Sequence, residues 1–279
     1  MEYPPRVVTI AGSAAGGSAG IQADLKTFQE LDVYGMSVIS AIVGKHPSTG
    51  RNVHVQTIEA IEAQFATLMR QVGADALKTG MLFTKEVIKL TARLIEEYDI
   101  TSVVVDPVMI GKMDSKLLKD DAIDALVDRL IPCAKIITPN VPEASLLLGG
   151  RKLDTVDELK QAAVDLHALG APSVLIKGGR LKGPAIDVLY DGEDLTTLTA
   201  PRIDTVNTSG AGCTYSAAVA AYMAKGKSVK EAVRSAKEFV TAAIEHSFSY
   251  TDVVGPTYHA AVRKYGPGPA IQVETVRLD

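Results

Sequence analysis

The sequence predicts an α/β fold in which a mostly parallel sheet is covered by helices on both faces. Three observations lead to this prediction. Apolar runs of strand length alternate with helical patterns along nearly the whole chain. Of the 279 residues, 47% are apolar, which is enough to fill a sizeable core. No internal repeat, low-complexity segment or obvious linker interrupts the alternation, so we expect residues 1–279 to form a single domain.

The predicted strands are short apolar runs that end in glycine, proline or polar residues. In chain order they cover residues 6–12, 36–44, 76–82, 102–109, 134–140 and 173–179, followed by 187–192 and 195–203, which we expect to pair as an antiparallel hairpin at a sheet edge. The predicted helices repeat apolar residues at helical spacing over 21–33, 57–73, 84–99, 122–131, 155–170, 211–226 and 228–247. The tail from 266 to 279 is interrupted by glycine and proline, and we expect part of it to be loose.

Charge and cysteine content argue against several functions. The formal net charge is −4, from 29 Lys and Arg against 33 Asp and Glu, and no block of like charge predicts a surface for nucleic acid or for an anionic membrane. The first residues lack a basic region followed by a long apolar stretch, so we expect no signal peptide, no membrane span and a soluble, cytoplasmic protein. The two cysteines, Cys133 and Cys213, do not form a disulfide pattern, and we expect both to be free thiols.

Polar segments are concentrated where the predicted strands end. In an open parallel sheet, the loops at the carboxyl ends of the strands form the ligand crevice. The segments at these ends or just before helices read AGSAAGGSAGIQAD, VGKHPSTG, KTGM, DPVMIGK, TPNVPEA, IKGGRLKG and NTSGAGCT. We therefore expect the functional site to be built from them.

The glycine-rich segment after the first strand is neither a dinucleotide-binding motif nor a P-loop, because G-x-G-x-x-G and G-x-x-x-x-G-K-[ST] do not occur. Two interpretations remain. The segment is a flexible turn between strand and helix, or it closes over a small substrate, with Asp24 reaching a ring nitrogen or a hydroxyl group.

Four polar residues at strand ends each allow a structural and a functional interpretation. Asp106 follows an apolar strand, and a buried carboxylate there is costly unless a cation lies nearby. The alternative is that Asp106 caps the next turn. Asn140 and Glu143 have the spacing of a capping box, or they hold Mg²⁺ through water. Lys177 is an ordinary strand-end lysine, or its flanking glycines let the backbone approach a nucleotide.

The segment NTSGAGCT precedes an alanine-rich helix and predicts an anion site, because small residues let backbone N–H groups converge at a helix N-terminus. Gly210, Ala211 and Gly212 would donate to a transferring phosphate, Lys177 would neutralise the leaving group, and Cys213 would lie beside the substrate hydroxyl with a lowered pKa. With Mg²⁺ this combination predicts phosphoryl transfer. No zinc spacing occurs, and we assign no histidine a catalytic role.

Several motifs together resemble the ribokinase-like kinases, and within them the hydroxymethylpyrimidine kinase branch: TIAGSAAGGSAGIQADLKTF, DALKTGML, VVVDPVM, ITPNVPEA and NTSGAGCTYSAA. The similarity runs along nearly the whole chain. It implies a three-layer α/β/α sandwich without a separate lid domain, and it places Cys213 where the sugar kinases of the superfamily carry an aspartate base. The segments AKEFVTAAIEHSF and VVGPTYHAAVR are most similar to the pyridoxal kinases of this branch.

This resemblance implies phosphorylation of the 5′-hydroxymethyl group of pyridoxal, pyridoxine or pyridoxamine by ATP and Mg²⁺ in vitamin B6 salvage, by an enzyme that commonly forms a homodimer. Lys45 replaces a glutamine usual in pyrimidine kinases, which weakens the alternative of a hydroxymethylpyrimidine or phosphomethylpyrimidine kinase of thiamin biosynthesis. Gly111 replaces a second cysteine that many pyridoxal kinases have, so we expect no mechanism with two cooperating cysteines. A non-catalytic binding protein on the same scaffold is a further alternative.

The resemblance also implies a role for individual residues. The catalytic group is Cys213 with Gly210, Ala211 and Gly212. The ATP site comprises Asn140, Lys177, Gly178, Gly179, Lys182, Asp187, Thr208, Gly210, Gly212 and Val240. The substrate site comprises Gly12, Ser13, Asp24, Val43, Lys45, Met81, Val108 and Cys213. The metal ligands are Asp106 and Glu143.

Overall fold

The structure is a computed structural model that describes residues 3–44, 47–50, 52–110, 118 and 120–278. The strands are β1 Arg6–Ala14, β2 Tyr34–Val43, β3 Val53–Val55, β4 Ala76–Thr79, β5 Val103–Val105, β6 Ile136–Ile137, β7 Val174–Ile176, β8 Ala185–Tyr190, β9 Asp194–Ala200 and β10 Gln272–Arg277. The helices are α1 Ile21–Glu30, α2 Ile58–Gln71, α3 Lys85–Glu97, α4 Asp120–Ala125, α5 Val141–Leu147, α6 Val156–His167, α7 Ala211–Ala224, α8 Val229–Glu245 and α9 Ala261–Tyr265. Helix α4 continues through the turns η2 Leu126–Leu130 and η3 Ile131–Cys133.

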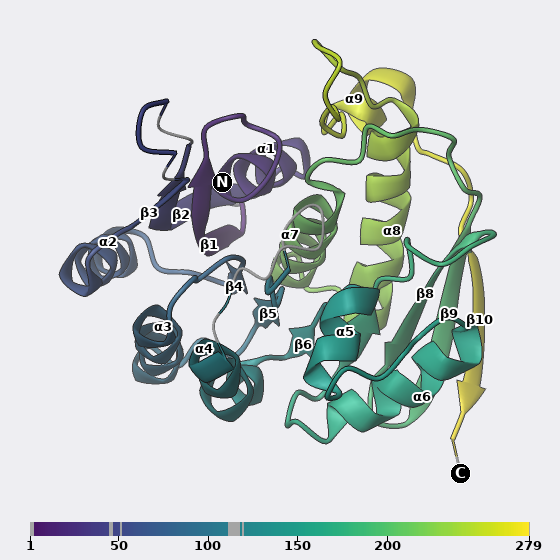
Figure 1. Cartoon of the computed structure of the whole chain (residues 1–279), viewed down its shortest axis with the longest axis horizontal. Helices are drawn as coiled ribbons and strands as arrows, with labels where there is room; N and C mark the ends of the chain where they lie inside the picture. Colours follow the sequence, from purple (N-terminus) through teal and green to yellow (C-terminus); the bar gives the residue numbers. More distant parts are fainter. Residues whose placement is uncertain (1–2, 45–46, 51, 111–117, 119, 279) are drawn as a thin grey trace.

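Within the described residues the strands form one ten-stranded sheet in the order β10-β9-β8-β7-β6-β5-β4-β1-β2-β3 (Figure 1). From β2 to β7 the neighbouring strands are parallel. The strands β3, β8, β9 and β10 pair in the antiparallel sense. The predicted α/β fold with a mostly parallel sheet is therefore confirmed.

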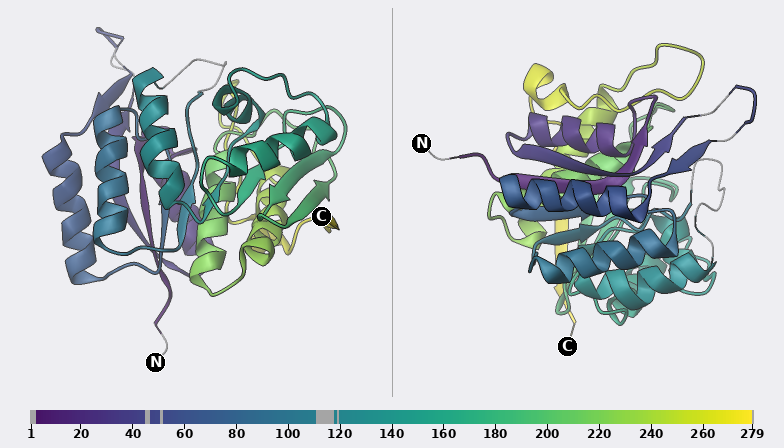
Figure 2. Two further views of the ribbon diagram at one scale, coloured as in Figure 1. Left: turned by 90° about the horizontal axis from the view of Figure 1, so that it is seen from below. Right: turned by 90° about the vertical axis from the view of Figure 1, so that its left-hand side faces the viewer.

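Helices cover both faces of the sheet (Figures 1 and 2). Successive side chains of a strand point to opposite faces, and the core is divided accordingly. Val7 and Val104 pack in one apolar cluster with α1, α7 and α8. Val8, Val103 and Val105 pack in a second cluster with α2, α3, α4 and α6. Because both faces are buried, the central strands are almost continuously apolar, which is why the sequence identified them.

The hairpin of β8 and β9 forms as predicted, but it is not the edge of the sheet. Strand β10 pairs antiparallel with β9, from Gln272 opposite Thr199 to Arg277 opposite Asp194. The expectation of a loose tail is wrong for these residues. The run from 272 to 277 contains no glycine or proline and includes β-branched residues that favour a strand. Strand β3, which the sequence analysis did not predict, forms the other edge.

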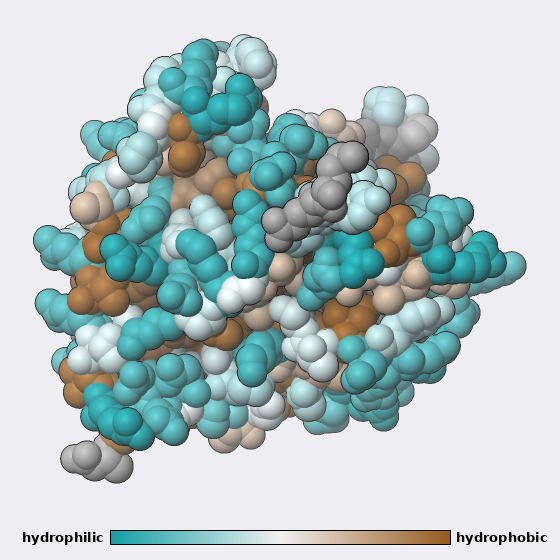
Figure 3. All heavy atoms as spheres, turned by 180° about the vertical axis from the view of Figure 1, so that it is seen from behind, coloured by the Kyte–Doolittle hydropathy of each residue, from teal (hydrophilic) through white to brown (hydrophobic). Residues whose placement is uncertain are grey.

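The surface and the two cysteines agree with a globular protein that buries most of its apolar residues. The face opposite to that of Figure 1 is mainly hydrophilic, with apolar residues in smaller groups between (Figure 3). No helix within the described ranges is both long and apolar enough to cross a membrane. Cys133 and Cys213 are free thiols, as predicted.

Candidate active site

A cavity of about 520 Å³ opens where β5, β6 and β7 end and α7 begins. Many of the predicted site residues line it: Asp106, Val108, Asn140, Glu143, Lys177, Gly179, Asp187, Thr208, Gly210, Ala211, Gly212, Cys213 and Val240. The polar residues predicted at the carboxyl ends of the parallel strands therefore line one cavity, and their roles stay predictions.

The turn before α7, residues 207–213, has the backbone that the sequence predicts for an anion site. Gly210 has φ 84°, and a side chain on it would lie 1.7 Å from the carbonyl oxygen of Ser18. Only glycine fits there, because the glycine-rich loop after β1 lies directly against this turn. The Ala211 N–H donates to the carbonyl of Thr208 at 3.2 Å. The predicted donation from the Ala211 N–H to a phosphate is therefore not supported, whereas Gly210 and Gly212 stay predicted donors and the Cys213 N–H, in the first turn of α7, is a further candidate.

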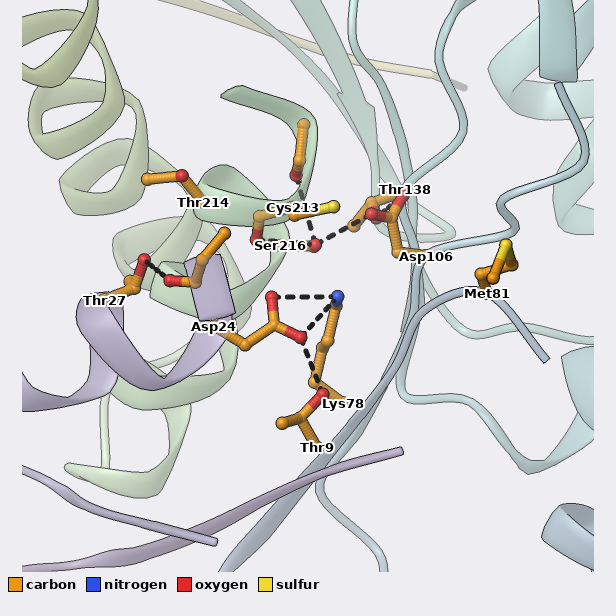
Figure 4. A network of polar contacts seen from close by, with 12 residues as sticks. Thr9, Asp24, Thr27, Lys78, Met81, Asp106, Thr138, Cys213, Thr214 and Ser216 are labelled. Carbon is orange, nitrogen blue, oxygen red and sulfur yellow. Dashed lines mark hydrogen bonds and ion pairs between the residues drawn. The ribbon is translucent and has the colours of Figure 1, made fainter. Parts of the chain in front are cut away.

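Asp106 and Lys177 form a buried ion pair at the wall of the cavity. Lys177 Nζ donates to Asp106 Oδ1 at 2.7 Å, and the side chains are 10% and 3% exposed. Thr138 donates to the same oxygen, Oδ1, at 3.3 Å, and Ser216 donates to the other oxygen, Oδ2, at 2.9 Å (Figure 4). Burial opposes the charged form of Lys177, but Asp106 and Glu143 raise its pKa, so the lysine keeps its positive charge beside the cavity.

Glu143 forms the capping box that the sequence allowed and also lies on the cavity wall, and its role toward Mg²⁺ stays a prediction. It forms a capping box with Asn140: the Asn140 side chain accepts from the Glu143 N–H at 3.0 Å, and the Glu143 carboxylate accepts from the Asn140 N–H at 2.9 Å. It also lines the cavity while being 2% exposed. Burial raises the pKa of Glu143 to about 7, Lys177 opposes this, and Asp106 adds to it. A cation at this position would relieve the mutual repulsion of the two carboxylates.

The donor set suits a magnesium ion that is held mainly by phosphates and water. Asp106 and Glu143 offer carboxylate oxygens, which Mg²⁺ prefers, and Mg²⁺ often binds through only one or two protein carboxylates. Within the described part of the chain, no group of three or more His, Cys, Asp or Glu side chains gathers as a metal site. The residues therefore fit a nucleotide-bound ion better than a permanently bound structural metal.

Cys213 lies on the cavity wall, but the prediction of a lowered pKa is wrong. Burial raises the pKa of the Cys213 thiol; Lys78 lowers it, Asp24 and Asp106 raise it, and the N–H of Gly20 lowers it slightly. The start of α7 alone does not decide the charge of this thiol, because burial and two carboxylates act against ionisation.

A second buried ion pair, Asp24 with Lys78, lies near Cys213 (Figure 4). Lys78 Nζ lies 3.0 and 2.9 Å from the two oxygens of Asp24, and Thr9 donates to one of these oxygens at 2.7 Å. All three residues are 0% exposed. Asp24 therefore faces Lys78 rather than the open cavity, and its direct contact with a substrate stays a prediction. The sequence analysis included Lys78 in the segment KTGM but gave it no role, although a lysine inside the apolar run ALKTG was a usable signal.

The predicted substrate residues around β1 come together. A side chain on Gly12 would lie 2.6 Å from Met81 and 3.5 Å from Val43, so these three residues are neighbours. The Ser13 hydroxyl is engaged by the Gln22 amide, which donates to it at 2.7 Å. Lys45 and Gly111 lie outside the described residues.

The predicted ATP residues of the 177–187 region divide into two groups. Asp187 lines the cavity, accepts from the Gly178 N–H at 2.9 Å and pairs with Lys237 at 2.6 Å. Gly178 lies behind the wall, where a side chain would meet the Ile186 carbonyl at 1.9 Å. Lys182 is exposed on the loop and is not part of the wall, so its contact with ATP stays a prediction. The sequence analysis missed Lys237, which is 5% exposed and lines the cavity from α8.

Comparison with known proteins agrees with this geometry. The family model described as phosphomethylpyrimidine kinase matches residues 15–258. A pyridoxine kinase of Bacillus subtilis (strain 168) is 51% identical over 262 residues, which are 92% of this chain and 97% of that protein. A hydroxymethylpyrimidine/phosphomethylpyrimidine kinase of the same organism is 43% identical over 93% of this chain and 96% of its own. The solved structure of the pyridoxal kinase from Staphylococcus aureus in complex with AMP-PCP and pyridoxal has a TM-score of 0.90 at 40% identity and covers 99% of this chain and 100% of that one.

Proposed function

The chain belongs to the phosphomethylpyrimidine kinase family, and we propose that it transfers the terminal phosphoryl group of ATP to the 5′-hydroxymethyl group of pyridoxal, pyridoxine or pyridoxamine. One observation carries this proposal: a glycine turn suited to an anion, a buried lysine, two carboxylates and a thiol line the same cavity. The likeness to a pyridoxine kinase at 51% identity, against 43% for a pyrimidine kinase, favours a B6 vitamer as acceptor.

The chain's own residues supply positioning and charge, which is most of what phosphoryl transfer requires. The substrate hydroxyl oxygen attacks the terminal phosphorus as the bond to the leaving ADP breaks, and the hydroxyl proton passes to an oxygen of the transferred phosphoryl group or to water. We expect the N–H groups at the start of α7 to stabilise the charge of the transferring group, and Lys177 to stabilise the charge that develops on ADP. Because burial raises the pKa of Cys213, we favour a thiol that orients the hydroxyl over a thiolate base. A Cys213→Ala enzyme with near-normal turnover would contradict both roles.

Mg²⁺ is the cofactor that the donor set favours. Asp106 and Glu143 would hold it, and when bound it would neutralise charge on the phosphates. We also propose a cytoplasmic location and a homodimer. A light-scattering measurement of the mass of the protein in solution would test the homodimer.

The pyrimidine kinase is the second candidate, because the family model and a relative at 43% identity have that name. The test is a coupled assay with ATP and Mg²⁺ that gives kcat/KM for pyridoxal, pyridoxine and hydroxymethylpyrimidine. A preference for pyridoxal of about a hundredfold, or about 2.7 kcal/mol of transition-state binding, would support the B6 assignment. The opposite preference would assign the enzyme to the pyrimidine, and no turnover of any substrate would support a binding protein.

A further inference from the structure

The segment 255–259, between α8 and α9, contacts the turn before α7, residues 207–213, which we call the cysteine turn. This segment has no role in the proposed chemistry. The Gly255 N–H donates to the Asn207 side chain at 2.8 Å, and the Ser209 N–H donates to the Gly255 carbonyl at 3.0 Å. The Thr257 N–H returns a bond to the Ser209 carbonyl at 3.2 Å. These contacts form a short parallel bridge and fix the beginning of the turn.

The end of the turn is held by His259 through Thr214, the residue after Cys213. The Thr214 N–H donates to the Gly210 carbonyl at 2.8 Å, which closes the first hydrogen bond of α7. Its hydroxyl lies 3.0 Å from Nε2 of His259 and 3.4 Å from the Thr257 hydroxyl. Thr214 is 0% exposed and His259 is 6% exposed, so water does not compete for these contacts.

The three residues at the centre of the turn, Gly210, Ala211 and Gly212, have no polar side chain that could fix their position. Gly210 and Gly212 have no side chain, and that of Ala211 is a single methyl group. Glycine backbone has more conformational freedom than any other, so a turn of this composition needs support from outside. Burial lowers the pKa of His259 to about 4, with a smaller contribution from Lys26 that Glu30 opposes, so the imidazole is neutral near pH 7. One uncharged buried ring therefore supplies a fixed hydrogen-bond partner to Thr214.

We propose that His259 is a positioning residue for phosphoryl transfer. Through Thr214 it sets the orientation of the first turn of α7, and with it the Cys213 thiol and the N–H groups of Gly212 and Cys213. This inference rests on the proposed function for its kinetic effect. A misplacement of about 1 Å in such a site is enough to lower a rate by about a hundredfold.

The kinetic test compares four single variants, one double variant and one control variant of the full chain with the wild type. In His259→Ala and Thr214→Val, we expect kcat to fall by about tenfold to a hundredfold, with KM for pyridoxal changed less than about threefold. His259→Gln, which can place a nitrogen or oxygen near Nε2, and Thr214→Ser, which keeps the hydroxyl, should recover most of kcat. The His259→Ala/Thr214→Val double variant should be no slower than the slower single variant, because both remove the same contact. His167→Gln is the matched control, since His167 packs on Tyr190 at a ring distance of 5.2 Å and lies outside the cavity wall.

A second measurement does not depend on turnover. Cys133→Ser leaves Cys213 as the only cysteine of the chain, so its rate of alkylation by iodoacetamide can be followed by mass spectrometry. We expect His259→Ala and Thr214→Val to change this rate at least threefold relative to Cys133→Ser alone, and Thr214→Ser to restore it. Unchanged alkylation, additive kinetic losses, or a lower melting temperature with normal kcat would each overturn the proposal. If His259→Ala does not fold, Thr214→Val decides by the same criteria. If the wild type has no kinase activity, the proposed function fails while the alkylation result still decides the role of His259.

Discussion

Replacing Lys78 by methionine should destabilise the folded protein strongly, because it leaves the Asp24 carboxylate buried without its counter-charge. Both side chains are 0% exposed, and Lys78 Nζ contacts both oxygens of Asp24 at 2.9 and 3.0 Å. Removing one partner of a buried pair typically costs about 3–5 kcal/mol, while replacing both partners is often close to neutral. For a domain of this size, about 2 °C of melting temperature is lost per kcal/mol, so we expect a decrease of roughly 6–10 °C.

Differential scanning calorimetry and urea unfolding measure this effect. The Asp24→Asn/Lys78→Met double variant should recover most of the lost free energy of unfolding, since Thr9 can still donate to the asparagine oxygen. Arg6→Met is the matched control, because it removes an ion pair with Asp75 whose side chains are 41% and 36% exposed, and we expect it to cost less than about 1 kcal/mol. A Lys78→Met protein as stable as the Arg6→Met protein would refute the reasoning. A double variant that is less stable than both the Asp24→Asn and the Lys78→Met single variants would also refute it.

Three further predictions concern the cavity and the cysteine turn. Lys177→Met should lower kcat by about a hundredfold to a thousandfold in the coupled assay, whereas Lys160→Met, on the exposed side of α6, should leave it within twofold. Gly210→Ala should lower both kcat and the melting temperature, because φ is 84° and the new methyl group would meet the Ser18 carbonyl at 1.7 Å; normal values of both would contradict the turn geometry. In the folded protein, burial keeps His259 neutral. The free energy of unfolding that depends on this neutral ring is fully present above pH 6.5, the ordinary pKa of histidine, and is lost as the pH falls toward the folded pKa of about 4. Between these limits the wild type should lose about 3 kcal/mol more than His259→Gln, measured by urea unfolding, and equal losses would show that the ring is not held neutral.

The sequence located the sheet and the site well because their signals are local. A parallel strand buried on both faces is a continuous apolar run, and the polar residues that follow such a run come together at one edge of the sheet. Asp106, Asn140 and Lys177 follow β5, β6 and β7 in this way, and the structure places all three on one cavity wall.

The sequence-based predictions failed where contacts between residues far apart in the sequence determine the structure or the charge. The charge of Cys213 depends on burial and on Lys78, Asp24 and Asp106, which are far from it in sequence. Strand β10 forms because β9 offers an unpaired edge, which the residues 266–279 alone do not reveal. Lys237 was not predicted because its partner Asp187 lies on β8, 50 residues earlier in the chain.

The contacts between residues 255–259 and the cysteine turn have a consequence for biosynthesis. A ribosome makes Asp24, Asp106, Lys177 and Cys213 before it makes the segment that binds the turn from outside. Domains begin to fold while the chain is still being made, so a nascent chain can contain all of these residues while the turn still lacks its support. The support of the turn is therefore added only near the end of translation.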